Sequence, residues 1–524
     1  MNRLRHRFLV LLLLFLPATG AWAEGGMVSS ADPRASAAGQ EILRKGGSAA
    51  DAAMAMMLAL TVVEPQSSGI GGGGFILHHD ARQGLIESID GRETAPASAR
   101  PDLFLGPDGK PLPFPVAFPG GKSVGVPGNI ALMARAHARW GKLPWAELFA
   151  PAIRLAEEGF VVNAVLHSRL SQLAPLWQDF PEARSLYWRD GKPAAVGTVL
   201  RNRALGAFLR RLAAEGASAF YSGENAAAIG QAVAGAPVNP AEIKAADLAA
   251  YAAKERAPVC GHYRVYKICG MGPPSSGGVT VIQILGMLER FDLARLGKDS
   301  PVSWHLIGEA MRLAYADRDK WLADSDKVAV PVAALIDPAY LRARSRLIDP
   351  ARARGDYAAG NPPGAPSRTR AISAEVPATT HFVAIDGAGD IASMTSTVEG
   401  PFGSQLIVNG YFLNNELTDF TFAPEKDGAP VANRVEPGKR PLSSMAPTIV
   451  YDAAGRPIFT VGAAGGRTII MQVAKAIIAH LDWGLNGRDA IGLGLLYFDR
   501  NGLILERGAG LDGLAGSLEA MGHS

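Results

Sequence analysis

Hydrophobic positions follow two different spacings in the two parts of the chain. Up to about residue 325 they recur every three or four residues, which is the spacing of one helix face. This pattern predicts helices over residues 32–47, 48–65, 128–141, 143–160, 277–291 and 302–324. Segment 48–65 is apolar nearly all round and begins at the N-cap candidate Ser48, so it predicts a buried helix.

The second part begins after about residue 376 and has the pattern of short strands joined by turns. Strands are predicted over residues 381–385, 390–398, 409–417, 445–452 and 457–464, followed by a helix over 467–484. Between the two parts, from about Val328 to Val376, the regularity fades and Pro, Gly and Ser become frequent. This composition predicts an exposed, poorly ordered segment or linker.

Threonines gather at the open end of the first predicted hairpin, whose turn is formed by residues 386–390. Antiparallel pairing brings Thr379 opposite Thr397, with their Cβ atoms about 5 Å apart. The same register brings Thr380 opposite Ser396, so the pairing does not choose between the two threonines. Threonine is common in strands, and a purely structural Thr-rich hairpin is the alternative.

The chain has 524 residues, of which 48% are hydrophobic and 19% charged, and this composition is typical of a folded enzyme. Three arginines precede an apolar run over residues 8–16, and small residues at 21 and 23 form a cleavage motif. This pattern predicts a signal peptide over 1–23, and hence a periplasmic or secreted protein; an uncleaved anchor is the alternative. Removing 1–23 leaves basic and acidic residues equal in number, so no nucleic-acid partner is indicated.

Cys260 and Cys269 flank a predicted strand. A straight strand would hold them too far apart to bond, although an exported protein could pair them. Two free thiols and one disulfide both remain open at this point. Two cysteines without a clustered-histidine motif predict no metal site, and no cofactor is expected.

Two glycine-rich motifs match known patterns only in part. Residues 69–74 read GIGGGG, but a helix precedes them and a strand follows, the reverse of a dinucleotide fingerprint. The better interpretation is a loop whose glycines allow other parts of the backbone to approach it closely. Residues 121–125 read GKSVG, a possible nucleophile elbow around Ser123, although the preceding segment is broken by prolines.

Other short stretches combine charge with turn chemistry. Gly465 and Gly466 lie where a predicted strand gives way to a helix, and free backbone N–H groups there favour an anion. Arg92, Glu416 and Asp419 could together clamp an amino-acid zwitterion. Taken singly, each of these stretches is more often a turn or a solvated surface feature.

Together these stretches resemble the γ-glutamyltransferase (γ-glutamyl transpeptidase) family over nearly the whole chain after the leader. The matching motifs, in order, are QEILRKGGSAADAAMAM, SSGIGGGGF, IDGRETAP, GVPG, PPSSGG, AMRLAYADRD, TTHFVAIDG, FLNNELTDF, KRPLSSMAPTIV and GAAGGR. The resemblance implies an N-terminal nucleophile hydrolase, an α/β protein with a four-layer αββα sandwich. It further implies self-cleavage between Ala378 and Thr379 into a large subunit, 24–378, and a small subunit, 379–524, that share one domain.

The resemblance also implies roles for site residues. Thr379 becomes the nucleophile, its own α-amine accepts the proton, and Thr397 bonds to its hydroxyl. Gly465 and Gly466 donate N–H groups to the oxyanion. The donor, a γ-glutamyl amide such as glutathione, is held at its α-carboxylate and α-ammonium, and water or an amine takes up the acyl group. The donor-binding residues are Arg92, Ser443 and Ser444 for the carboxylate and Glu416 and Asp419 for the ammonium.

Three features depart from the family's pattern. Glu399 stands where many members have Asn beside the ammonium. The segment 420–442 has no Tyr and is short for a closing lid. The end of the chain matches poorly after residue 502, which leads us to expect a shortened sheet. A related acylase acting on glutaryl-type amides, such as a β-lactam side chain, is one alternative function, and an inactive, uncleaved binding protein is the other.

Overall fold

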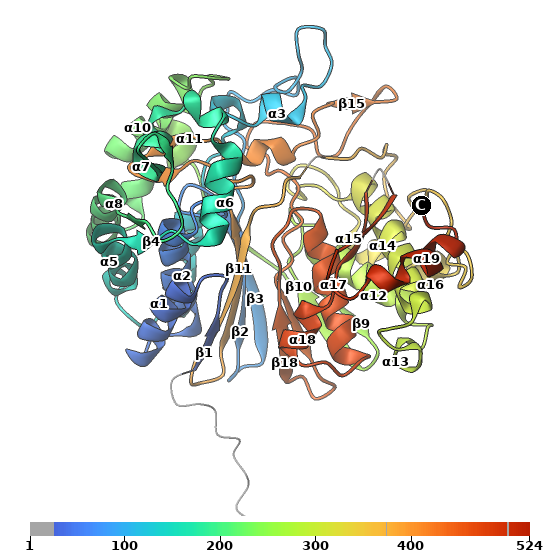
Figure 1. The fold of residues 1–524 in the computed structure, drawn as a ribbon. Helices are drawn as coiled ribbons and strands as arrows, with labels where there is room; N and C mark the ends of the chain where they lie inside the picture. Colours follow the sequence, from blue (N-terminus) through green and yellow to red (C-terminus); the bar gives the residue numbers. More distant parts are fainter. Residues whose placement is uncertain (1–25, 374, 500–501) are drawn as a thin grey trace, which may run out of the picture.

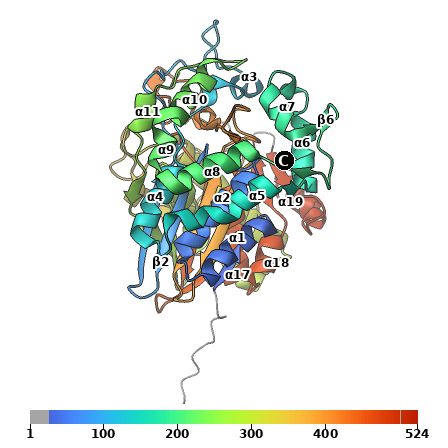
Figure 2. The same ribbon diagram turned by 90° about the vertical axis from the view of Figure 1, so that its left-hand side faces the viewer.

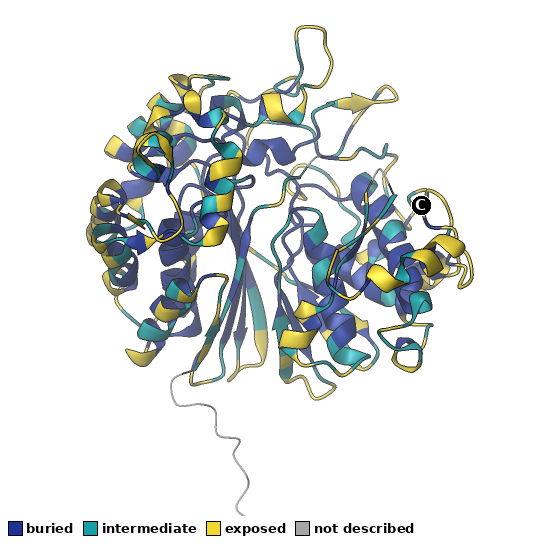
Figure 3. Cartoon of the chain, in the orientation of Figure 1, coloured by how far each residue is buried: buried dark blue, intermediate teal, exposed yellow. Residues whose placement is uncertain are grey.

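Two antiparallel sheets lie face to face at the centre of the molecule, and helices cover the outer face of each (Figure 1). The structure is a computed structural model that describes residues 26–373, 375–499 and 502–524. The inner strands of the sheets and the inner sides of the helices are buried, and exposed residues lie mostly on the outer surfaces (Figure 3). The predicted αββα sandwich is confirmed.

Each central sheet contains strands from both sides of residue 379. The six-stranded sheet has the order β1 (Met27–Ser29), β11 (Thr380–Ile385), β12 (Ile391–Thr397), β2 (Gly73–Asp80), β3 (Leu85–Gly91) and β8 (Lys254–Arg256). The four-stranded sheet has the order β18 (Pro457–Val461), β17 (Thr448–Tyr451), β10 (Tyr266–Gly270) and β9 (Val259–Tyr263). A cut at residue 379 would therefore leave two chains that still share both sheets.

The two helical layers are formed by different parts of the chain. One is formed by α1 (Pro33–Arg44), α2 (Ala49–Val63), α4 (Asn129–Trp140), α5 (Ala150–Glu158) and α8 (Arg203–Glu215), and Figure 2 views it from outside. The other contains α12 (Gly277–Leu288), α14 (Pro301–Trp321) and α17 (Thr468–Leu481). Every residue of α2 is buried, and Ser48 with Asp51 forms a capping box at its start, as the sequence pattern predicts.

Shorter elements complete the two sides. The remaining helices are α3 (Phe114–Ala117), α6 (Ala164–Leu173), α7 (Pro181–Tyr187), α9 (Ser218–Tyr221), α10 (Gly223–Ala234), α11 (Ala245–Ala249), α13 (Leu293–Leu296), α15 (Val332–Leu335), α16 (Pro338–Ser345), α18 (Gly487–Gly492) and α19 (Ala515–Ala520). Two-stranded ribbons pair β4 (Phe160–Val161) with β7 (Val199–Leu200), β5 (Trp188–Arg189) with β6 (Lys192–Pro193), β13 (Ile407–Val408) with β14 (Tyr411–Phe412), β15 (Glu425–Lys426) with β16 (Ala429–Pro430), and β19 (Leu496–Asp499) with β20 (Gly502–Leu505).

Two segments differ from their predictions. The stretch 328–376 contains α15 and α16, and its Tyr357 is buried with the hydroxyl bonded to Glu309, so it is not simply an exposed linker. The strand predicted over 409–417 is reduced to the two residues of β14, and a 3₁₀ turn follows at Glu416–Asp419. The first segment packs against α14 and the second against α10. These tertiary contacts decide the conformation of both segments, and they cannot be read from local periodicity.

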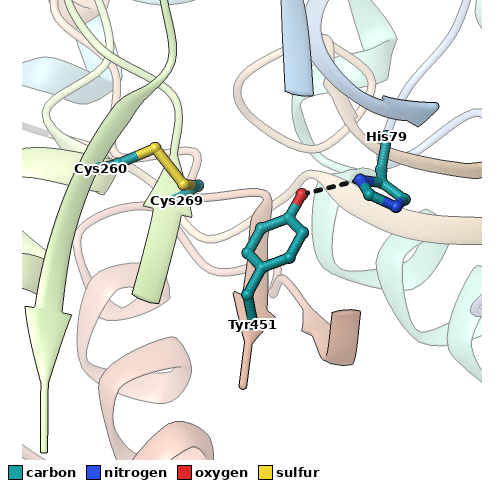
Figure 4. The surroundings of a disulfide bond; sticks show 4 residues. All are labelled: His79, Cys260, Cys269 and Tyr451. Atoms are coloured by element: carbon teal, nitrogen blue, oxygen red, sulfur yellow. Dashed lines mark hydrogen bonds between the residues drawn. A yellow bond between two sulfur atoms is a disulfide. The ribbon is translucent and has the colours of Figure 1, made fainter. Parts of the chain in front are cut away.

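Cys260 and Cys269 form a disulfide, with their Cα atoms 4.2 Å apart (Figure 4). The single strand predicted between them is a hairpin, because the chain reverses at Arg264, whose φ is +55°. The reversal places the cysteines directly opposite one another on β9 and β10. Beside them, the Tyr451 hydroxyl of one sheet lies 3.3 Å from His79 Nδ1 of the other (Figure 4).

The predicted signal peptide, residues 1–23, lies outside the described residues. Within the part of the chain that the structure describes, no helix combines the length and apolar character needed to cross a membrane.

Candidate active site

Thr379 and Thr397 meet at the open end of the β11–β12 hairpin. Their Oγ1 atoms lie 3.0 Å apart, and both side chains are buried. The predicted register is confirmed, with Thr380 opposite Ser396. The second hydroxyl pair is not bonded, because Ser396 Oγ instead accepts from Asn129 at 2.9 Å. The structure thus distinguishes the two threonines where the sequence pattern did not.

The glycine-rich loop 69–74 supports this pair from behind. A Cβ on Gly72 would lie 1.9 Å from the backbone oxygen of Thr397, a distance that no side chain can accept. The backbone oxygen of Ser67, two residues before the loop, accepts the N–H groups of Thr379 and Val398 at 3.2 and 3.3 Å. The interpretation of 69–74 as a closely approached backbone loop, not a nucleotide site, agrees with these contacts.

The backbone at Thr379 is strained. Its φ is +86°, a region that β-branched residues almost never adopt and that costs about 1–3 kcal/mol. The intact peptide between Ala378 and Thr379 is held in this geometry from both sides. The Ala378 oxygen accepts the N–H of Gly465 at 3.0 Å, and the Thr379 N–H is bound by Ser67. The strained φ angle therefore belongs to the residue whose nitrogen is part of the Ala378–Thr379 peptide bond and whose hydroxyl is paired with Thr397.

Gly465 and Gly466 lie between β18 and α17, as predicted, and have φ values of +130° and +56°. Glycine adopts such values without steric cost. The Gly465 N–H points to the carbonyl oxygen of Ala378, which would carry the negative charge if that carbonyl were attacked. Gly466 packs against Val376, whose oxygen would lie 3.2 Å from an added Cβ.

Arg92 forms the polar centre of a pocket next to the threonines. Its guanidinium is buried and donates to Glu416, to Asp419 Oδ2 at 2.5 Å, and to the backbone oxygens of Pro441 and Leu442 at 3.1 and 2.8 Å. The interpretation of these stretches as solvated surface features is therefore wrong, because all three ionic side chains are buried.

The carboxylates of the pocket outnumber its cation. Burial raises the pKa of Glu416 and of Asp419 well above their usual range, against the opposing charge of Arg92. Burial also raises the pKa of Glu93 to about 8. Among the described residues, Asp419 Oδ1 is buried without a hydrogen-bond partner, and the carboxyl group of Glu416 faces that of Glu93. The pocket therefore offers acceptors for an additional cation, which would displace protons from these carboxyl groups.

Glu399 lies beside the threonine pair on a strained loop. Its φ is +77°, and its N–H donates to Thr397 Oγ1 at 2.8 Å. Its carboxyl group accepts from the Val376 N–H at 3.1 Å and from Asn415 at 2.5 Å. Burial, followed by the charge of Asp419, raises the pKa of Glu399 well above its usual range.

Ser443 and Ser444 line the same pocket, as predicted. The Ser443 hydroxyl accepts the Met445 N–H at 3.1 Å, and its carbonyl accepts Ser276. The Ser444 hydroxyl is 2.8 Å from Nη2 of Arg318. Arg318 lies inside the AMRLAYADRD motif, but the burial of an arginine cannot be read from a motif, so its contact with Ser444 could not be predicted.

Ser123 does not form a nucleophile elbow. The segment before it is α3 and a turn, not a strand, and its hydroxyl lies 2.6 Å from the backbone oxygen of Phe118. This serine hydroxyl closes a turn, so the serine-hydrolase alternative is wrong.

Glu64, which follows α2 directly, has a buried carboxyl oxygen, Oε2, without a hydrogen-bond partner in the described part of the chain. Burial raises its pKa to about 7. The folded protein keeps a proton here that the unfolded chain loses near pH 4.5, so stability falls as pH rises from 4.5 to 7, by about 3 kcal/mol in all.

We therefore expect Glu64→Gln to remove this part of the pH dependence. Denaturant unfolding of an uncut Thr379→Ala chain, with and without Glu64→Gln, measures it at pH 4.5 and pH 8. The variant should gain about 3 kcal/mol relative to its parent between the two pH values. An unchanged difference would contradict the raised pKa.

Comparisons with known proteins agree with this arrangement. A sequence model of the family described as "Gamma-glutamyltranspeptidase" matches residues 35–524. The chain is 37% identical over 481 residues to "Glutathione hydrolase proenzyme" of Bacillus subtilis, covering 89% of this chain and 79% of that protein. It is 36% identical over 517 residues to "Acylase ACY 1 proenzyme" of a Pseudomonas strain, covering 97% and 88%. A solved cephalosporin acylase from Bacillus halodurans superposes with a TM-score of 0.84 at 26% identity, covering 98% and 92%.

Proposed function

The chain belongs to the gamma-glutamyltranspeptidase family, and we propose that it is a self-cleaving γ-glutamyltransferase and glutathione hydrolase. The observation that carries this proposal is the position of Thr379. It combines a paired hydroxyl, a strained φ angle and an N–H donor on the preceding carbonyl, next to a buried pocket of one arginine and several carboxylates.

Self-cleavage would begin with attack of Thr379 Oγ1 on the carbonyl carbon of Ala378. The Thr379 hydroxyl proton passes to the amide nitrogen, the C–N bond breaks, and an ester joins Ala378 to the threonine oxygen. Water then hydrolyses the ester, leaving a carboxylate on Ala378 and a free hydroxyl and amine on Thr379. Gly465 N–H stabilises the negative charge on the oxygen, and release of the strained φ at Thr379 favours the reaction.

The mature enzyme would repeat this chemistry on a donor. The free α-amine of Thr379 takes the proton from its own hydroxyl, which attacks the γ-carbonyl of the donor. Gly465 and Gly466 bind the oxyanion, and the amine leaves with a proton. Water or the amine of an amino acid or peptide then attacks the threonine ester and regenerates the hydroxyl.

Donor recognition would use the opposite charges of the pocket. Arg92, Ser443 and Ser444 are proposed to bind the α-carboxylate, and Glu416 and Asp419 to bind the α-ammonium. In the described part of the chain Asp419 Oδ1 has no hydrogen-bond partner and could accept from that ammonium. Glu399 adds one more carboxylate beside them. These roles predict that donor analogues without the α-carboxylate, without the α-ammonium or without both bind less well than the donor itself.

Incubation of the purified protein with glutathione tests the activity. We expect release of glutamate in water, and a new γ-glutamyl dipeptide when an amino acid is added in excess. A correctly folded and cleaved protein that releases no glutamate from glutathione would refute the proposal.

Thr397→Val should slow self-cleavage about 100-fold, because valine keeps the shape but removes the hydroxyl that contacts Thr379 and the Glu399 N–H. The fraction of cut chain over time, read from a denaturing gel, measures this. Ser393→Ala removes another buried hydroxyl from β12 and should cleave normally. Cleavage of Thr397→Val at the wild-type rate would exclude the proposed contact.

An acylase acting on glutaryl-type amides is the second candidate, because relatives named acylases match the chain as extensively. A glutaryl group has no α-ammonium. It would leave Asp419 Oδ1, which has no hydrogen-bond partner among the described residues, buried without a ligand, and this costs free energy and favours the γ-glutamyl donor. An uncleaved binding protein is the third candidate, and it would be excluded if the purified chain is found to be cleaved.

We further propose that residues 1–23 form a signal peptide and that the protein acts in the periplasm or outside the cell. The mature enzyme would consist of a large subunit, 24–378, and a small subunit, 379–524. Supporting this arrangement, both central sheets contain strands from each subunit.

A further inference from the structure

The turn at Gly465 and Gly466 has little of its own to fix its geometry. Glycine adopts the positive φ values of this turn without steric cost, so the backbone alone does not select one conformation. The N–H and hydroxyl of Thr468 bind the Gly465 oxygen at 3.2 and 2.8 Å, which ties the turn only to the start of α17. An oxyanion is stabilised by N–H groups that are held in position before the reaction. The turn therefore needs support from another part of the fold.

Two side chains of α14 contact the residue that follows the glycines, Arg467. Asp319 accepts from its guanidinium with both oxygens, from Nη1 to Oδ1 at 2.9 Å and from Nη2 to Oδ2 at 3.2 Å. Tyr315 lies one turn earlier on the same face of the helix, and its hydroxyl donates to the backbone oxygen of Arg467. The guanidinium also lies over the Tyr315 ring, 5.2 Å from its centroid. Both the side chain and the main chain of Arg467 are thus bound to α14.

α14 is a firm support, and its contact with Arg467 is ionic. The helix has 21 residues, most of them buried, and close packing keeps buried residues in place. Burial alone would raise the pKa of Asp319, but the charges of Arg467 and Arg318 hold that pKa below its usual value. The carboxylate is therefore ionised at neutral pH. Removing one partner of such a buried ion pair strongly disturbs the other.

Asp319 lies behind the donor pocket. Among the described residues, those that line the pocket include Gly466 but neither Asp319 nor Arg467. In the uncut chain Asp319 also holds the segment before the proposed cut, because its backbone oxygen accepts the Ala371 N–H at 3.0 Å and its Oδ2 lies 3.6 Å from Nη2 of Arg370. An effect of Asp319 on a bound donor must therefore pass through its neighbours.

We propose that Asp319 is a positioning residue, which through Arg467 fixes the Gly465–Gly466 turn in the geometry that binds the oxyanion. The inference rests on the function proposed above and adds to it a residue of the large subunit that touches no substrate. Self-cleavage, acylation of Thr379 and hydrolysis of the acyl-enzyme each form an oxyanion at this turn. All three steps would consequently depend on the Asp319–Arg467 pair.

Asp319→Asn in the mature enzyme tests the inference, with γ-glutamyl p-nitroanilide as the donor. Asparagine keeps the shape of the side chain but loses the charge that holds Arg467. Per cleaved and folded enzyme, kcat should fall about 100-fold, because the N–H groups move away from the oxyanion. KM should stay within about twofold, since acylation and hydrolysis slow together and the donor-binding residues are unchanged. An unchanged kcat, or a higher KM without a lower kcat, would overturn the proposal.

Asp317→Asn is the matched control, because this buried acid of the same helix pairs with Arg344 and not with the turn. Its kcat should equal that of the wild type. Arg467→Gln should lose about as much as Asp319→Asn, and the double variant should lose no more than either single variant. Losses that add up in the double variant would show that the two residues act separately, which contradicts the proposal.

The uncut chain gives an independent readout if Asp319→Asn matures slowly. Its self-cleavage should be about tenfold slower than that of the wild type, because the Gly465 N–H also binds the Ala378 oxygen. Tyr315→Phe removes the hydroxyl bond to Arg467 and leaves Asp319 and the segment before the cut unchanged, and it should slow self-cleavage about fivefold. Cleavage of both variants at the wild-type rate would overturn the proposal.

The same assays separate this inference from the proposed function. A wild type that releases no p-nitroaniline refutes the function itself. An active wild type whose kcat is unchanged in Asp319→Asn refutes only the role of Asp319.

Discussion

Thr379→Ala should leave the chain in one piece and without activity towards γ-glutamyl donors. The substitution removes the only atom proposed to attack the Ala378 carbonyl, so neither the new α-amine nor the acyl-enzyme can form. We expect the loss to be complete within detection, because removal of a nucleophile typically costs about 10⁶-fold. A denaturing gel of the purified variant over several days, together with a glutathione assay, measures both effects.

The matched control is Thr380→Val. Thr380 is the neighbouring threonine, and its buried hydroxyl faces the carboxyl group of Glu64 and not the Thr379–Thr397 pair, so valine fits the same space without changing that pair. This variant should cleave like the wild type. If Thr379→Ala is still cleaved and residue 380 is the new terminus, the nucleophile is Thr380 and the assignment to Thr379 is wrong.

Asp419→Asn should lower kcat/KM for γ-glutamyl donors by about 100- to 1,000-fold. Asparagine keeps the shape of the side chain but cannot supply the buried negative charge that an α-ammonium requires. The same substitution should have little effect on a glutaryl amide, which has no ammonium. Kinetics with γ-glutamyl and glutaryl p-nitroanilides, measured side by side, therefore give both the size of the effect and its cause.

Asp427→Asn serves as the control for this prediction, because Asp427 is exposed in the turn between β15 and β16. Its kinetics should match those of the wild type with both donors. Equal losses of Asp419→Asn on the two donors would indicate a general disturbance of the pocket and contradict the role in ammonium binding. A wild type that prefers the glutaryl donor would favour the acylase alternative.

Local pattern was sufficient to predict much of the fold. The period of the apolar residues located α2 and α14, and turn length fixed the register of β11 and β12. The disulfide was not predictable, because it depends on a reversal at Arg264 that shortens one apparent strand into two. The burial of α16 and Tyr357 was not predictable either, because the composition of the stretch that contains them is typical of a linker.

In the site, too, local sequence motifs predicted some features, whereas contacts between residues distant in the sequence could not be predicted. Motif positions predicted that Arg92, Glu416 and Asp419 act together, and they do meet, but the pattern could not show that Arg92 contacts both carboxyl groups directly in the uncut chain. The contacts of Arg318 join residues 42 to 126 positions apart, so no local pattern contains them. The strain at Thr379 is a property of the backbone in three dimensions and has no sequence signature of its own.

The most direct test of this account is the amino-terminal sequence of the smaller chain in the purified wild-type protein. The account predicts two chains, and the smaller one should begin Thr-Thr-His-Phe, with Thr379 first. A single chain that stays intact, or a smaller chain that begins at any other residue, would contradict it.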